Sequence, residues 1–251
     1  MIKTMWTKLV RTTESYLGAS ARACRYCGLD ANRNTGSGLG LCRRCHDRVP
    51  WIDAIRCLRC GRPDSCPDCE RHSHSALYAS RSAVRYDERM KEWLAAYKYR
   101  GNERLHDLFA DMLHRAYKRH EADYTREGPI HWITFVPVSE RKLEERGFNQ
   151  AAQLAGSWGR LTGIPVVPLL RRNRDTVKQS SKNRMERLRD LEGAFSVDED
   201  GLNRILKKSG HLPINIVIVD DVYTTGSTLN HCAQTIRDHM DANVFGLTWA
   251  R

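Results

Sequence analysis

The fold is decided by one stretch, Ile214-Asn-Ile-Val-Ile-Val-Asp-Asp-Val-Tyr-Thr-Thr-Gly-Ser-Thr228. Its first six residues are almost all apolar and β-branched, and the run stops abruptly at two carboxylates. Continuous apolar character, without alternation, is typical of a strand that helices cover on both faces, as in a parallel α/β sheet. Ligands of such sheets bind at the carboxyl ends of the strands, so the sequence predicts a site directly after Val219.

The turn after this strand has the chemistry of an anion site. Hydroxyl groups come from Thr224, Thr225, Ser227 and Thr228. Gly226 lets backbone N–H groups close around an anion, and a helix that starts near Ser227 would aim its N-terminal dipole at it. Asp220 and Asp221 would repel a phosphate, so we expect them to accept hydrogen bonds from sugar hydroxyls. Together these groups predict a ribose 5-phosphate pocket.

The whole stretch resembles the 5-phosphoribosyl-1-pyrophosphate (PRPP) motif of type I phosphoribosyltransferases: a hydrophobic strand, Asp-Asp, two residues, then Thr-Thr-Gly-Ser-Thr. The resemblance implies an α/β fold with a parallel sheet flanked by helices. It implies that Asp220 and Asp221, as the catalytic carboxylates, bind the ribose 2′- and 3′-hydroxyls. The phosphate-binding loop would consist of Val222, Tyr223, Thr224, Thr225, Gly226, Ser227 and Thr228.

Composition narrows the class of protein. Lys plus Arg number 41 against 30 Asp plus Glu, a formal net charge of +11, which favours anionic partners such as nucleic acid or phosphorylated metabolites. The nine cysteines come mainly as CxxC pairs, and no secretory segment precedes them, so we expect a reduced, metal-binding protein of the cytoplasm. No apolar run approaches the roughly 20 residues that span a bilayer.

Eight of the cysteines form two sets of two pairs. The first set is Cys24, Cys27, Cys42 and Cys45, and the second is Cys57, Cys60, Cys66 and Cys69. Two CxxC pairs at the separation of the first set are typical of structural zinc held by four thiolates. Because only five residues separate the pairs of the second set, this set either forms a second compact metal site or its pairs bind crosswise, each to a different one of two ions. His72 and His74 are substitute ligands or solvated side chains, so one or two zinc ions are expected.

Residues 1–20 have helical apolar spacing, which suits a helix on a membrane surface or one packed on its own domain or a partner. Nine arginines lie between Arg22 and Arg62, with Tyr26 and Trp51 nearby. They indicate either single-stranded nucleic acid binding through phosphates and stacking, or a solvated basic face. The expected organisation is an N-terminal helix over 1–20, a cysteine-rich module over 21–80, and a phosphoribosyltransferase-like domain over 81–251.

Within residues 81–251 we expect core-facing helices over 90–101 and 105–117, and a strand over 132–138. The first helix ends in Lys98-Tyr-Arg-Gly101, which would turn basic groups toward the site. A charged turn over 139–142 and a helix from about Asn149 should follow. Strands over 195–197 and 244–249 are expected to complete the sheet, with a helix through Cys232, a core thiol.

Residues 146–150 narrow the family further. They are Arg146, Gly147, Phe148, Asn149 and Gln150. This element, with the CxxC pairs before it and the PRPP-like loop after it, resembles the ComF-type competence proteins over nearly the full length. The resemblance implies handling of incoming single-stranded DNA during natural transformation, alongside a ComF-type helicase and recombination-mediator proteins. From the residues, Gly147 would permit close backbone approach, Phe148 would anchor the turn, and Arg146 and Asn149 would hold it or face an anion.

By the same resemblance, the pyrophosphate of PRPP, with Mg²⁺, would meet a turn and a flexible loop. The expected contacts are Ser139, Arg141, Lys142, Lys178, Lys182 and Arg184. Residues 171–190 carry eight basic and three acidic side chains, so this segment should resist collapse until an anion arrives. A basic loop of this kind suits closure over pyrophosphate and equally suits a clamp on a DNA backbone.

Three functions are compatible with the sequence. The first is a ComF-like protein of DNA uptake with a ribose-phosphate site. The second is an active phosphoribosyltransferase that acts on an amine or base, although no stretch identifies a pocket for that acceptor. The third is a DNA-binding adaptor or sensor whose pocket binds without turnover.

Overall fold

The computed structural model describes residues 23–29, 38–67, 69, 75–99, 104–173, 193–208 and 213–251. The chain divides into two compact units, Met1–Val49 and Pro50–Arg251. The helix expected over 1–20 lies outside the described residues. Among the residues that are described, none of the helices has the length and apolar character needed to cross a membrane.

The smaller unit contributes the first four cysteines and one short helix, α2 (Arg43–His46). The chain folds back on itself here, because the backbone N–H of Arg25 donates to the carbonyl of Gly40 at 3.0 Å. The second set of cysteines belongs to the larger unit. The module boundaries expected from composition stay a prediction.

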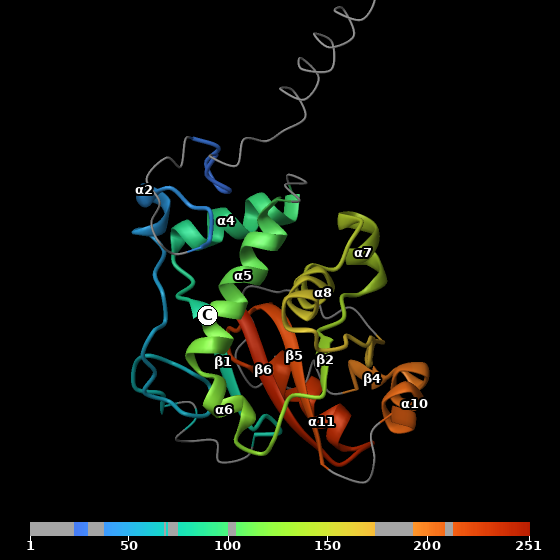
Figure 1. The fold of residues 1–251 in the computed structure, drawn as a ribbon. Coiled ribbons are helices and arrows are strands. Elements are labelled where there is room, and N and C mark those ends of the chain that lie inside the picture. Colours follow the sequence, from blue (N-terminus) through green and yellow to red (C-terminus); the bar gives the residue numbers. More distant parts are fainter. Residues whose placement is uncertain are drawn as a thin grey trace, which may run out of the picture. The chain divides into compact units, whose positions relative to one another are not determined.

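A parallel sheet organises the larger unit, in the order β1-β6-β5-β2 (Figure 1). Its strands are β1 (Ala79–Val84), β2 (Trp132–Phe135), β5 (Ile214–Val222) and β6 (Ala242–Ala250). All three pairings are parallel. The expected α/β class, with a phosphoribosyltransferase-like sheet flanked by helices, is therefore confirmed. The PRPP-like stretch forms a central strand, as its apolar run predicted.

Helices cover both faces of this sheet. The helices that the structure describes in the larger unit are α4 (Glu88–Tyr99), α5 (Arg104–Arg119), α6 (Glu121–Thr125), α7 (Glu140–Arg146), α8 (Gln150–Thr162), α10 (Glu199–Lys208) and α11 (Ser227–Arg237). One face is covered by α5, on β1 and β6, and by α8, on β5 and β2; the other is covered by α11. The first core is aromatic, with Phe109 stacked on Trp249 at 4.0 Å between ring centroids. The second is aliphatic and includes Ile216, Ile218 and the buried Cys232.

Two expectations about the elements were wrong. The charged turn expected over 139–142 is the start of helix α7, because Ser139 takes the extended N-cap conformation and Gly147 ends the helix in the left-handed conformation. Phe195–Val197 forms β4, but it does not join the parallel sheet. It pairs antiparallel with β3 (Leu170–Arg172) in a separate two-stranded sheet. The helices at α4, α5, α8 and α11 were predicted correctly.

Candidate functional site

The acidic pair lies where the chain leaves the buried part of β5. Residues 214–219 are buried, whereas Asp220, Asp221 and Val222 are half-buried, so the carboxylates reach the carboxyl edge of the sheet. The backbone N–H of Asp221 donates to Oδ1 of Asp220 at 2.8 Å. This bond fixes the first carboxylate close to the main chain. The second carboxylate points elsewhere and pairs with Lys98, at the end of α4.

These charges set the protonation of the pair. Burial, and then repulsion from Asp221, raise the pKa of Asp220 to about 8, against the opposing effects of the Asp221 N–H, Lys98 and Arg172. The side chains of Lys98 and Asp221 are each only 17% exposed, so water screens their ion pair weakly. The surroundings therefore favour a proton on Asp220, while Asp221 pairs with Lys98.

The following loop is shaped to leave backbone donors open. Its start is tied to the sheet, because the N–H of Tyr223 donates to the carbonyl of Ala250 at 2.8 Å. Gly226 has φ +79°, and a Cβ placed on it would lie 2.1 Å from the Tyr223 hydroxyl oxygen, so only glycine fits. Gly226 is also the N-cap of α11 and has no capping side chain. The N–H of Ser227 makes only a long bond, 3.4 Å, to Oγ1 of Thr225, so this end of the helix suits an anion.

Hydroxyl groups line the same turn. The Oγ1 of Thr225 and the Oγ of Ser227 are 2.8 Å apart and share a hydrogen bond. Ser227 is buried, Thr225 and Thr228 are half-buried, and Thr224 is exposed. The loop therefore combines hydroxyl donors, a glycine in the left-handed conformation and a helix N-terminus, which together suit a phosphate.

A second loop reaches the same edge from the neighbouring strand. Beyond β2 the ladder continues, because the N–H of Val136 donates to the carbonyl of Val219 at 3.0 Å. Ser139 is 4% exposed, and its hydroxyl has no hydrogen-bond partner in the part of the chain that the structure describes. A buried hydroxyl of this kind is costly unless a ligand or water completes it. Arg141 pairs with Glu145 at 2.8 Å on α7, the helix that also carries Lys142.

The Arg146–Gln150 element is the joint between α7 and α8. Asn149 accepts from the N–H groups of Ala151 and Ala152 and donates to the carbonyl of Val136, so it caps α8 and ties it to β2. Arg146 donates to Oε1 of Gln150 at 3.0 Å. A Cβ on Gly147 would meet nothing within 4 Å of the described protein atoms, so the close backbone approach expected there stays a prediction. Its φ of +75° is what requires glycine.

Phe148 lies against Tyr97 of α4, with 5.9 Å between ring centroids. Tyr97 in turn donates to Oε1 of Gln153 at 2.8 Å. The joint between α7 and α8 is therefore connected to the helix that brings Lys98 to Asp221. The anchoring role expected of Phe148 agrees with this contact.

Three expected pyrophosphate contacts lie outside the described residues: Lys178, Lys182 and Arg184. Their segment leaves and re-enters the described chain through β3 and β4, which pair with each other. Arg172, the last residue of β3, opposes the rise in the pKa of Asp220 through its charge. The start of this basic segment is thus electrostatically coupled to the acidic pair.

The eight paired cysteines form two separate groups of four thiols. They are Cys24, Cys27, Cys42 and Cys45 in one group and Cys57, Cys60, Cys66 and Cys69 in the other, with the sulfur atoms of each within 4.8 Å of one another. Tetrahedral zinc with bonds of about 2.3 Å places its sulfur ligands roughly 3.8 Å apart. The Cys27–Cys42 and Cys60–Cys66 sulfur pairs, at 3.9 and 3.5 Å, fit this geometry.

One thiol in each group is prepared to ionise. Burial raises the pKa of Cys24, but N–H groups of Cys27, Cys42 and Tyr26 outweigh it and bring the pKa to about 7. Cys57 reaches about 7 in the same way, chiefly through Cys60. Burial raises the pKa of Cys27, Cys45, Cys60 and Cys69. The grouping of four sulfur atoms, and not these pKa values, is what fits a metal ion with no open position for catalysis. Crossed pairing of the second set is excluded by the grouping, and His72 and His74 lie outside the described residues.

The second group is connected to the phosphate loop. Arg251, which follows β6, donates to the carbonyl of Cys60 and lies over the Tyr223 ring at 4.8 Å. A second arginine, Arg59, also contacts the backbone of this four-cysteine group and donates to the carbonyl of Cys69 at 3.1 Å. Sequence reasoning did not find Arg251, because nothing near it in the chain has a motif; only its place after a predicted strand could have suggested it.

Three known proteins that are similar to this chain are all competence proteins, although no family model matches the chain. The chain is 32% identical to Competence protein ComFC of Bacillus subtilis (strain 168) over 206 residues, covering 78% of this chain and 77% of that protein. It is 27% identical to Competence protein ComFC of Streptococcus pneumoniae over 202 residues, covering 79% and 81%. Competence protein F of Haemophilus influenzae is 31% identical over 103 residues, 41% of this chain and 42% of that protein.

Proposed function

The chain belongs to the ComFC family of competence proteins, and on this premise we propose that it acts in DNA uptake and binds the ribose 5-phosphate part of PRPP at the carboxyl end of β5. In this proposal it handles incoming single-stranded DNA in the cytoplasm, with a ComF-type helicase and recombination-mediator proteins as partners. The two four-cysteine groups hold structural zinc.

One observation carries the ribose-phosphate site: an acidic pair stands directly beside an anion cradle. Asp220 and Asp221 offer acceptors to the two ribose hydroxyls, and the loop around Gly226 offers N–H and hydroxyl donors to the phosphate. Lys98 neutralises Asp221 and would have to exchange partners when the sugar binds. Mg²⁺ bound with PRPP would supply further positive charge at the same edge.

The second candidate is catalysis, and two features favour it. The unpartnered Ser139 hydroxyl and the charge of Arg172 lie on the side where pyrophosphate would leave. In a phosphoribosyl transfer, Asp220 and Asp221 would orient the ribose while the loop fixes its phosphate. Residues Ser139, Arg141, Lys142, Lys178, Lys182 and Arg184 would bind the leaving pyrophosphate. The third candidate, an adaptor that binds without turnover, uses the same contacts.

Calorimetric titration with Mg·PRPP tests the proposal, using the full zinc-loaded chain. We expect saturable binding to the wild type and its loss in Asp220→Asn/Asp221→Asn, because the neutral amides lose the charge that complements Mg²⁺ and hold the ribose hydroxyls more weakly. A matched control is Asp238→Asn/Asp241→Asn, which removes two exposed carboxylates after α11 and before β6. Binding that survives in the first variant, or is lost in both, contradicts the site.

Turnover can be separated from binding in the same samples. Release of pyrophosphate in the presence of mixed amines and bases would favour the transferase, and binding without release would favour the adaptor. Transformation frequency in cells that carry Asp220→Asn/Asp221→Asn then shows whether the site is needed for DNA uptake.

A further inference from the structure

A cavity of about 750 Å³ lies within the larger unit, away from the acidic pair. Three segments line it: residues 56–69 around the second four-cysteine group, the amino end of β1, and the end of α6. None of its lining residues belongs to the Asp220–Thr228 stretch. Its volume falls in the range of cavities that hold nucleotide-sized ligands.

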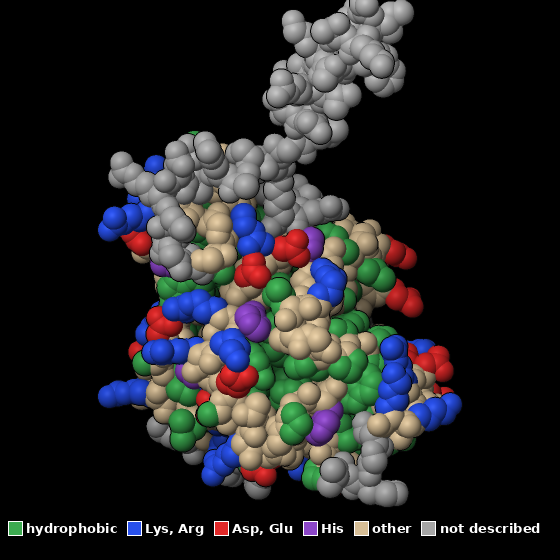
Figure 2. Space-filling view, in the orientation of Figure 1, with side chains coloured by type: hydrophobic (Ala, Val, Ile, Leu, Met, Phe, Trp, Pro, Cys, Tyr) green, Lys and Arg blue, Asp and Glu red, His purple; other side chains and the backbone are tan. Residues whose placement is uncertain are grey.

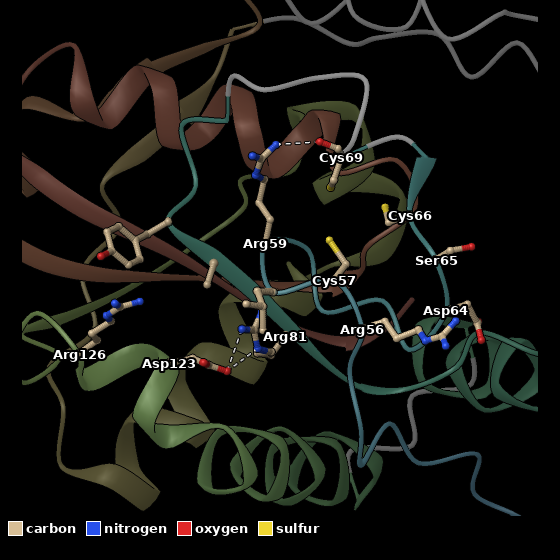
Figure 3. Close-up of a pocket in the computed structure, with 13 residues that line it drawn as sticks. Arg56, Cys57, Arg59, Asp64, Ser65, Cys66, Cys69, Arg81, Asp123 and Arg126 are labelled. Atoms are coloured by element: carbon tan, nitrogen blue, oxygen red, sulfur yellow. Dashed lines mark hydrogen bonds and ion pairs between the residues drawn. The ribbon is translucent and has the colours of Figure 1, made fainter.

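Its polar lining is dominated by arginine. Arg56, Arg59, Arg81 and Arg126 face two acidic residues, Asp64 and Asp123. Figure 3 shows Asp123 and Arg126 at one end of the cavity and Arg56 with Asp64 at the other, with Arg81 and Cys57 between them.

Both aspartates are already matched. Buried Arg81 pairs with Asp123 at 2.8 Å, and Arg85, outside the cavity, pairs with Asp64 at 2.8 Å. The charge that remains at the lining comes from Arg56, Arg59 and Arg126. Arg56 and Arg126 are exposed, whereas Arg59 is half-buried and bonded to Cys69.

The metal site affects where an anion would bind. Four thiolates on a divalent ion carry a net charge of −2. Arg59 and Arg251 donate to the backbone of this group and offset part of that charge. An anion is therefore repelled from the sulfur atoms and attracted to the ends of the cavity, at Arg56 and Arg126. Figure 2 shows basic and acidic side chains interspersed over the face of the molecule in view.

Flat apolar surface lies beside these charges. Tyr78 is 43% exposed, and its ring is held in place by Phe245, at 5.3 Å between centroids, and by a bond from its hydroxyl to Glu127 at 2.6 Å. A ring fixed at both its face and its tip loses little entropy when a base stacks on it. Leu58, at the tip of the Cys57–Cys60 turn, is 72% exposed and lines the same cavity.

We infer that this cavity binds a nucleotide, separately from the ribose-phosphate site, with a base on Tyr78 and its phosphate on the neighbouring Arg126, while Arg56 at the other end takes a further phosphate when the ligand is a strand. The same chemistry is offered by a free nucleoside monophosphate and by one unit of a DNA strand. The DNA alternative rests on the proposed function, and the free-nucleotide alternative does not.

The test measures binding of a labelled oligothymidylate by fluorescence polarisation, at about 50 and about 200 mM salt, to the full zinc-loaded chain. In Arg56→Gln/Arg126→Gln we expect roughly ten-fold weaker binding and a salt slope lower by about 1 to 2, because two phosphate contacts are lost. Tyr78→Leu should weaken binding between about five- and a hundred-fold, and Tyr78→Phe, which keeps the ring, much less. Arg204→Gln/Lys207→Gln removes two exposed charges on α10 and should bind like the wild type.

Thymidine monophosphate distinguishes the two sources. Competition by the monophosphate assigns the cavity to free nucleotide, and binding of the strand alone assigns it to DNA, provided that the arginine variant weakens binding as expected. The inference is overturned if Arg56→Gln/Arg126→Gln binds both probes like the wild type, if the α10 variant weakens binding equally, or if the wild type binds neither probe.

Mg·PRPP titration of the same variants keeps the two proposals apart. Arg56→Gln/Arg126→Gln should bind Mg·PRPP normally, which also shows that the variant is folded. If no form of the protein binds Mg·PRPP while oligonucleotide binding follows the arginines, the ribose-phosphate site fails and the nucleotide cavity stands.

Discussion

The two four-cysteine groups share their local chemistry and differ in what surrounds them. Each begins with a Cys-x-x-Cys-Gly turn, and Gly28 and Gly61 have nearly the same φ, +73° and +68°. A Cβ on Gly28 would meet nothing within 4 Å, whereas one on Gly61 would lie 2.5 Å from the carbonyl oxygen of Ser80 in β1. In the second group, Cys60 and Cys66 are buried, while Cys27 of the first group is exposed.

This difference shows that a similar four-cysteine group can be a self-contained element or a part of a larger core. The first group is completed within residues up to Val49. The second is attached to the sheet by the N–H of Ser80, which donates to the carbonyl of Arg59 at 2.7 Å, and by Arg251. Loss of the two metals should therefore have unequal effects on the sheet.

The largest effect is expected from removing one ligand in each group. Cys60→Ser should lose one metal ion and lower the free energy of unfolding of the larger unit by roughly 4 kcal/mol or more, because a metal site joined to the core is lost. Cys45→Ser should also lose one ion but leave that free energy within about 0.5 kcal/mol. Five of the six tryptophans lie after Val49, so tryptophan fluorescence in a urea titration, with zinc analysis, reports on the larger unit. Equal destabilisation by both changes would contradict the contrast.

The paired glycines give a smaller but cleaner difference. Gly28→Ala should cost about 1 kcal/mol in its own group, from the left-handed backbone alone. Gly61→Ala should cost roughly 2 to 4 kcal/mol, because the new methyl group also clashes with the β1 backbone. Zinc release to a chelator and the urea midpoint of each variant measure the two costs. A Gly61→Ala protein as stable as Gly28→Ala would show that the turn does not press on the strand.

A change of pH should act in opposite directions on the two four-cysteine groups and on Asp220. Thiols must lose protons to hold a metal, so both groups release it as the pH falls. Asp220, with its pKa raised to about 8, binds a proton in the folded state that the unfolded state loses above about pH 4. The metal-loaded larger unit should then lose stability as the pH rises from 6 to 7, by about 1 kcal/mol. Urea unfolding at both pH values should show this slope in the wild type and not in Asp220→Asn.

The smallest effect is expected at the link between the second group and the phosphate loop. Arg251→Gln should weaken Mg·PRPP binding about five-fold, roughly 1 kcal/mol, since the cation over Tyr223 is lost. It should speed zinc release from the second group and leave the first unchanged. Calorimetry and chelator kinetics measure both, with Arg204→Gln as the control. Unchanged PRPP affinity together with faster zinc release would show that the loop does not depend on the metal group.

The sequence predicted best the elements whose apolar pattern is continuous. β5, α11 and the parallel sheet follow from the Ile214–Thr228 stretch, and the acidic pair is at the edge where it was expected. β1 was missed because three of its six residues are Ser80, Arg81 and Ser82, all buried. Their polarity hides the strand, because two of these side chains find their partners only in the fold: Arg81 pairs with Asp123, and Ser82 shares a hydrogen bond with Thr248.

Contacts between segments distant in the chain were the least predictable. The turn expected over 139–142 is instead the start of helix α7, and the residue that ends this helix, Gly147, lies five residues further on. Lys98 was expected near the site, but its pairing with Asp221 depends on how α4 packs. The arginine-lined cavity joins residues 56–69, 78–81 and 123–126, so no single stretch could reveal it.

The outer edge of β1 has a consequence for how the protein should be handled. Main-chain groups of Pro50, Ile52 and Arg59 bond to this edge at Arg85, Ala83 and Ser80. An uncovered edge strand is a template for pairing with another chain. The segment around Pro50 and Ile52 and the second four-cysteine group thus cover this edge together. We expect chelator-treated protein to form β-rich aggregates before it unfolds, and preparations kept in zinc and reductant to stay dispersed.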